Sequence, residues 1–165
     1  MPDLIPQERI ESKIYQIREL KVMMDRDIAE LYGVETKVLN QAVKRNIKRF
    51  PPDFMVQLTK EEMNNWKSQI VTSNSIRLGL RKRPFAFTEH GVLMLSSVLN
   101  SERAIQVNIQ IMRTFTRLRQ ILSTHDDIKK KLEEHDKQFK VVFMEINKIH
   151  RLLEPPEKPK RKFGF

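Results

Sequence analysis

A change in the spacing of apolar residues marks each element expected in the first fifty residues. Residues 13–24 place short apolar runs on both sides of the polar pair Arg18-Glu19, which predicts a small β-hairpin. Helical spacing follows over residues 25–32 and again over residues 35–48. We therefore expect a hairpin followed by two short helices.

The ends of these two helices are marked by residues with known backbone preferences. Asp25 is expected to cap the first helix, and Gly33 is expected to end it, because glycine tolerates the left-handed backbone of a sharp turn. Pro51-Pro52 stops the second helix, since the residue before a proline avoids the helical region. The pattern predicts two helices joined by a tight turn.

The middle of the chain mixes strand and helix signals. Residues 54–58 predict a strand, and Thr59 with Glu62 forms a capping box that opens a helix through Trp66. Residues 68–84 are polar and basic, which suggests a loop or a long hairpin. The segment after it is expected to contain a strand at residues 85–87, a helix at residues 89–99 capped by Thr88, and a long helix at residues 102–122.

Beyond Ser123 the apolar spacing becomes an unbroken heptad, with steps that alternate between four and three residues. The charges of residues 125–154 balance, as expected for a coiled coil. The pattern predicts a helix of roughly 40 Å that dimerises through Ile128, Leu132, His135, Phe139, Val142, Ile146, Ile149 and Leu153. His135 in this seam is interpreted as a polar residue that sets the register.

These patterns predict a mainly α fold with small β elements, of the α+β class. Residues 1–122 are expected to form a winged helix-turn-helix-like domain, and residues 123–154 a coiled-coil dimerisation helix. Residues 155–165 carry three prolines and no periodicity, so we expect a disordered basic tail.

The two short helices carry the residue spacing of a helix-turn-helix. Ala29 is a small residue where the helices would cross, Gly33 follows four positions later, and Val34 is an apolar residue in the turn. The second helix would be fixed to the first by Leu39, Ala42 and Val43. The same spacing also fits a purely structural helical hairpin, which stays open as the alternative.

The outward side of the second helix has no carboxylate, whereas a merely solvated surface usually mixes both charge signs. Amide side chains lie toward its start and cations toward its end, which suits base edges and phosphates respectively. We predict that base edges are contacted by Lys37, Asn40, Gln41 and Lys44. Asn46 lies on the apolar side and is expected to make a buried hydrogen bond or a cap.

Phosphate contacts are expected from the end of this helix and from a basic stretch further along the chain. If that stretch joins two strands, it resembles a wing that grips the neighbouring DNA backbone, and a disordered loop is the alternative. The predicted phosphate contacts are Arg45, Lys48, Arg49, Arg77, Arg81, Lys82 and Arg83.

Net charge and composition narrow the function further. The chain has 31 Lys and Arg against 21 Asp and Glu, a charge of +10 that makes nucleic acid the first partner to consider. It contains no cysteine, and its four histidines lack the spacing of metal ligands. It has no Gly-rich phosphate loop and no apolar run near the roughly 18 residues that span a membrane. We therefore expect no enzyme activity, no cofactor, no metal and no membrane association.

Two long runs of the sequence resemble a known family. The runs from Leu31 to Leu58 and from Phe87 to Arg113 are similar to the ORF-six N-terminal domain, a phage-type DNA-binding domain of the KilA-N superfamily. The resemblance covers roughly residues 5–120. It implies a DNA-binding domain associated with phage biology and gene regulation.

We therefore expect a sequence-specific protein that binds double-stranded DNA and acts as a phage-type or prophage-type transcriptional regulator or antirepressor. It is expected to be a homodimer or a higher homo-oligomer in the bacterial cytoplasm, on the nucleoid. The alternative comes from another class of function: a protein-interaction module that captures a protein partner through its coiled coil, with DNA binding secondary.

Overall fold

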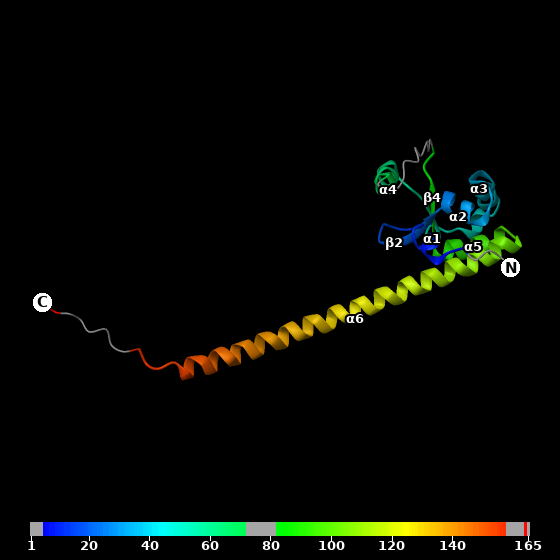
Figure 1. The fold of residues 1–165 in the computed structure, drawn as a ribbon. Helices are drawn as coiled ribbons and strands as arrows, with labels where there is room; N and C mark the ends of the chain where they lie inside the picture. The colour runs from blue at the N-terminus through cyan, green and yellow to red at the C-terminus, as the bar shows by residue number, and fades with distance from the viewer. Residues whose placement is uncertain (1–4, 72–81, 158–163, 165) are drawn as a thin grey trace. The chain divides into compact units, whose positions relative to one another are not determined.

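The structure is a computed structural model that describes residues 5–71, 82–157 and 164 (Figure 1). The chain divides into two compact units, Met1–Leu118 and Arg119–Phe165. Helices and a four-stranded antiparallel sheet make up the described part of the first unit, so the expected α+β class is confirmed. In chain order the elements are α1 (Gln7–Glu11), β1 (Ile14–Ile17), β2 (Leu20–Met24), α2 (Asp25–Tyr32), α3 (Thr36–Arg45), the 3-10 turn η1 (Ile47–Arg49), β3 (Met55–Gln57), α4 (Lys60–Val71), β4 (Phe85–Thr88), α5 (Glu89–Val98) and α6 (Glu102–Leu153).

The sheet has the strand order β1-β2-β4-β3, and each neighbouring pair is antiparallel. β1 and β2 form the predicted hairpin around Arg18-Glu19. β4 lies between β2 and β3, so Phe87 is opposite Met23 on one side and opposite Met55 on the other. The two inner strands therefore come from distant parts of the chain.

Helices cover both faces of the sheet, and the inner strands alternate between them (Figure 1). Met23 and Phe87 lie in the core that α2, α3, α5 and the first turns of α6 form on one face. Val22 and Met24 lie in a second core on the other face, together with Trp66 of α4. Because the last three residues of β2, 22–24, are buried on both faces, they are apolar in succession instead of alternating with polar residues.

Helix α3 ends at Arg45, earlier than the predicted boundary at residue 48. Asn46 follows with a non-helical backbone, and its side-chain amide donates to the carbonyl oxygen of Ala42 over 2.9 Å. Asn46 is thus the C-cap, one of the two roles expected of it, and its side-chain hydrogen bond is part-buried and not buried. As a result, Lys48 lies on the 3-10 turn η1 and not on the helix.

Helices α4 and α6 are longer than the sequence pattern predicted. α4 continues beyond Trp66 to Val71, because Ile70 also packs against the second core. The first residues of the segment predicted as a loop are therefore helical. α6 runs unbroken to Leu153 over 52 residues, since residues 102–153 contain neither proline nor glycine.

Two predicted helix caps are present. At the start of α4, Glu62 donates its N–H to Oγ1 of Thr59 over 3.2 Å, and the Glu62 carboxylate accepts the Thr59 N–H over 2.8 Å. At the start of α5, Oγ1 of Thr88 accepts the N–H of Gly91 over 3.4 Å. A Cβ atom on Gly91 would lie 2.1 Å from the carbonyl oxygen of Phe54, so the approach of α5 to the segment before β3 requires glycine.

An ion pair anchors the β1–β2 turn to α4. Arg18 and Glu19 both have positive φ values, 52° and 64°, in the left-handed region that favours glycine. Nε and Nη2 of Arg18 donate to the two carboxylate oxygens of Glu62 over 2.6 and 3.0 Å. Arg18 and the backbone N–H of Thr59 lower the pKa of Glu62 to about 2. The bidentate pair helps to hold a turn that its own residues disfavour.

Replacing Glu62 by Gln should keep the cap and remove the charge. Because the folded-state pKa of Glu62 lies below its ordinary value of 4.5, its stabilisation is present above pH 4.5 and is lost as the pH falls toward 2. We expect E62Q to lower the free energy of unfolding by up to about 1 kcal/mol at pH 7 and by much less at pH 2.5. Urea denaturation at both pH values measures this difference. Glu61→Gln on the same helix is the matched control, and a difference that stays constant with pH would contradict the prediction.

Candidate nucleic-acid interface

Helices α2 and α3 form the predicted helix-turn-helix. Gly33 has a left-handed backbone, with φ 72° and ψ 31°. Its N–H donates to the carbonyl oxygen of Glu30 over 3.1 Å, and the N–H of Val34 donates to that of Ala29 over 3.0 Å. This pair of bonds is a Schellman turn. Ala29 is buried in the same core as Leu39 of α3, so its small side chain allows the two helices to pack closely.

The outward side of α3 is cationic. Leu39 and Val43 are buried and determine which side of the helix faces the core. No residue of α3 carries a carboxylate. In the described part of the chain, no ion pair engages the exposed cations of α3 and η1. The exposed predicted contacts are Lys37, Gln41, Lys44 and Arg45 on α3 and Lys48 and Arg49 on η1.

Asn40 lies at the edge of this surface and is engaged within the protein. Its Nδ2 donates to Oδ2 of Asp25 over 3.0 Å, and the same oxygen accepts the N–H of Phe85 over 3.3 Å. The other Asp25 oxygen accepts the N–H of Arg26 over 2.7 Å. Asp25 is therefore the first residue of α2 and not its predicted cap, because its buried carboxylate instead connects α2, α3 and β4.

Arg49 and the remaining predicted phosphate contacts lie in two places. Arg49 of η1 donates to Oγ of Ser97 on α5 over 2.9 Å, which holds its guanidinium beside that helix. Lys82 and Arg83 are exposed directly before β4. Two further residues of the predicted wing lie outside the described part of the chain, namely Arg77 and Arg81.

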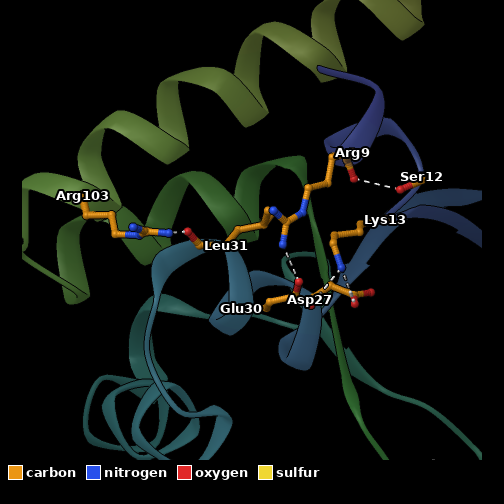
Figure 2. A network of polar contacts seen from close by, with 7 residues as sticks. All are labelled: Arg9, Ser12, Lys13, Asp27, Glu30, Leu31 and Arg103. Atoms are coloured by element: carbon orange, nitrogen blue, oxygen red, sulfur yellow. Dashed lines mark hydrogen bonds and ion pairs between the residues drawn. The ribbon is translucent and has the colours of Figure 1, made fainter. Parts of the chain in front are cut away.

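Two carboxylates of α2 have cationic partners near the N-terminal end of the domain (Figure 2). Glu30 accepts hydrogen bonds from Arg9 over 2.7 Å and from Lys13 over 3.0 Å. Lys13 also lies 3.3 Å from Oδ1 of Asp27. Burial raises the pKa of Asp27 and Lys13 opposes this shift, whereas Arg9 and Lys13 lower the pKa of Glu30. The pairing places two cations against the two carboxylates of α2 and offsets their negative charge.

Arg103 covers the turn between α2 and α3. Its Nε donates to the carbonyl oxygen of Leu31 over 3.3 Å (Figure 2), and a Cβ atom on Gly33 would lie 3.1 Å from the same nitrogen. Sequence reasoning missed both Arg103 and Arg9. No local signal could have found them, because their partners lie far away along the chain.

Val38 is a further residue of this surface that sequence reasoning missed. Its side chain is 46% exposed on the first turns of α3, near Lys37 and Gln41. The helical wheel contains the signal, since a residue next to Leu39 lies about 100° around the helix from it. The surface of α3 and η1 therefore combines cations and an amide with two exposed apolar side chains, Val38 on α3 and Ile47 on η1.

Residues 12–98 match the family of the ORF6N domain, a phage-type N-terminal domain. The chain belongs to the ORF6N domain family. The match runs from just before β1 to the last residue of α5, Val98, and it confirms the resemblance seen in the sequence. No curated protein and no solved structure matches the chain.

The ORF6N match covers every predicted DNA contact, and all of α6 lies outside it. In the second unit, each predicted seam residue is exposed, with fractions from 50% for Ile128 to 75% for Leu153 among the apolar ones. Among the described residues, no helix is both long enough and apolar enough to span a membrane. The ORF6N domain and the α6 seam are therefore separate candidate surfaces.

Replacing Asn40 by Ala should destabilise the ORF6N domain, because the buried Asp25 carboxylate loses one donor. We expect N40A to lower the free energy of unfolding by about 1 kcal/mol, measured by urea denaturation. Gln41→Ala, a neighbouring exposed amide on the same helix, is the matched control and should change stability by less than about 0.5 kcal/mol. Equal effects of the two substitutions would show that the Asn40 bond does not position α3.

Proposed function

We propose that this ORF6N protein binds double-stranded DNA in a sequence-specific manner and acts, without catalysis, as a phage-type transcriptional regulator or antirepressor. The observation that carries the proposal is the cationic outward side of α3, which a helix-turn-helix holds away from the core. In this mode α3 enters the major groove. Membership of a phage-type domain family supports a regulatory role.

The proposed contacts follow from the order of residues along α3. Lys37 and Gln41 lie toward its start and would contact base edges, where lysine suits guanine and glutamine suits adenine. Lys44 and Arg45 lie in the last turn and, with Lys48 on η1, would contact phosphates. Asn40 can reach a base only by giving up its bond to Asp25, so we assign it mainly to positioning α3.

Other basic residues would extend the contact along the DNA backbone. Lys82 and Arg83 are exposed before β4, and Arg49 is exposed on η1. We propose that they contact phosphates, together with Arg77 and Arg81. The protein would then work in the bacterial cytoplasm, on the nucleoid.

Self-association through the seam of α6 would bring two or more ORF6N domains to one DNA. Two copies related by a two-fold axis would read a pseudo-palindromic site. The same exposed apolar stripe also supports the second candidate function, in which α6 captures another protein and DNA binding is secondary.

A titration against duplex DNA at several salt concentrations tests the proposed binding to double-stranded DNA. Each neutralised phosphate contributes about −0.9 to the slope of log affinity against log salt. We expect a steep negative slope that Lys44→Ala makes shallower by about one unit. Lys60→Ala on α4, across the sheet, removes the same charge and should leave the slope unchanged. A flat slope, or no binding at low salt, would exclude the first function and favour the second.

The exposed Val38 should contact a thymine methyl group, the apolar feature of the major groove. Sites would first be enriched from a random duplex pool, and each thymine would then be replaced singly by deoxyuridine. At one position we expect the missing methyl to weaken wild-type binding about fourfold, equivalent to about 0.8 kcal/mol. Val38→Ala should abolish that difference. A V38A protein that still distinguishes thymine from uracil there would contradict the contact.

A further inference from the structure

The heptad of the second unit places its seam residues at two kinds of position. In a coiled coil the step from an a position to the next d is three residues, and the step from d to a is four. By this rule the d positions are Ile121, Ile128, His135, Val142 and Ile149, and the a positions are His125, Leu132, Phe139, Ile146 and Leu153. All ten residues are exposed in the single chain.

The two kinds of position differ in side-chain shape. Apart from His135, every d position carries a β-branched residue. The a positions are mixed, with leucine at Leu132 and Leu153 and one β-branched residue, Ile146. Two-stranded parallel coiled coils favour the reverse, with β-branched residues at a and leucine at d. Leucine at a with isoleucine at d shifts the preference to three or four strands.

The apolar surface is also wider than a two-stranded seam requires. Leu122 and Phe143 occupy e positions and Leu152 a g position, with exposed fractions of 48%, 65% and 82%. Positions e and g flank the seam of a two-stranded coil, where charged residues are usual. When more helices assemble, these flanking positions turn toward neighbouring helices and apolar side chains there become buried. Val141 and Met144 lie at outer positions and would stay in solvent.

The charged residues at e and g fit copies that run in the same direction and in register. In that arrangement a g position lies beside the e position five residues later on the neighbouring helix. Lys131 would then lie beside Asp136, and Glu145 beside His150. No like-charged pair is formed between these positions.

The geometry points to more than two copies of this chain that associate through α6 as a parallel, in-register coiled coil. Of the three-stranded and four-stranded forms we propose the four-stranded one, because an even number of chains leaves no ORF6N domain without a partner on the DNA. The partner of the exposed stripe is therefore the chain itself. This inference rests on the self-association in the proposed function. It adds the number of chains and the relative direction of their helices. Four chains supply two pairs of ORF6N domains. In each pair a two-fold axis can relate the two domains that bind one DNA site.

Sedimentation equilibrium of the full chain, without DNA, gives the number of copies. We expect a mass four times the 19.7 kDa of one chain. A mass of two or three chains would overturn the number of strands, and a single-chain mass would overturn self-association as well. The mass is measured without DNA, so it gives the number of chains whether or not the protein binds DNA in the titration.

A core exchange tests whether the shapes at a and d cause this number. One variant combines Ile128→Leu, Val142→Leu and Ile149→Leu with Leu132→Ile and Leu153→Ile. We expect its mass to fall to two chains, with helix content by circular dichroism unchanged. A control with Val141→Leu and Met144→Leu changes only outer positions and should keep four copies. If the exchanged variant keeps the mass of four chains, the side-chain shapes at a and d do not determine the number of chains.

A single introduced cysteine tests the direction, because the natural chain has none. In a parallel, in-register bundle, Ile128→Cys places thiols of neighbouring copies close enough for a disulfide. In a fully overlapped antiparallel bundle Ile128 lies beside Ile146 of each neighbouring copy, so the thiols at position 128 of neighbouring copies would be about 27 Å apart. We expect a disulfide-linked pair on a non-reducing gel after mild oxidation. A chain that remains uncrosslinked would overturn the parallel arrangement.

Discussion

The pairing of β2 with β4 is the interaction on which the rest of the ORF6N domain depends. It joins two strands from distant segments and places Met23 opposite Phe87 in the centre of the sheet. α2 follows β2 directly and α5 follows β4 directly, so this one pairing positions both helices on the same core. The core that receives α3 contains Met23 and Phe87 from these two strands.

The Asp25 carboxylate extends this pairing to the candidate DNA surface. It lies where β2 passes into α2, and it accepts both the N–H of Phe85 at the start of β4 and the amide of Asn40 on α3. A buried carboxylate is costly unless hydrogen bonds compensate it. The position of α3 is therefore tied to the sheet by a polar contact as well as by the apolar residues Leu39 and Val43.

The positive surface of α3 also depends on where the acidic groups are held. Asp27 and Glu30 belong to the neighbouring helix, and their charge would weaken the field beside α3 if it were uncompensated. Lys13 and Arg9 supply the compensation from the N-terminal segment. The net charge of the chain alone did not indicate that these acidic side chains are paired while the cations of α3 have no ion pair within the described residues.

Local signals in the sequence predicted much of this structure and missed the contacts between distant segments. Gly33, Thr59 and Thr88 marked helix ends correctly, because each acts through backbone groups within a few residues. Asp25 was misplaced, since its partners on α3 and β4 are not visible locally. The predicted lengths of α3 and α4 were wrong. The side chain of Asn46 ends α3 earlier than predicted, and the packing of Ile70 against the second core extends α4.

By itself, the sequence determined most of the elements, though not α1 or η1. It also determined the turn at Gly33, the cationic side of α3 and the heptad of α6, because each is a periodic or neighbouring pattern along the chain. Only the tertiary structure decided the strand order and the two cores. It also decided the engagement of Asn40 and the pairing of Arg9 and Arg103 with α2. The strand order, the two cores and these side-chain contacts all join groups that are distant along the chain. Local patterns allow many such contacts, and burial and charge pairing decide which of them form.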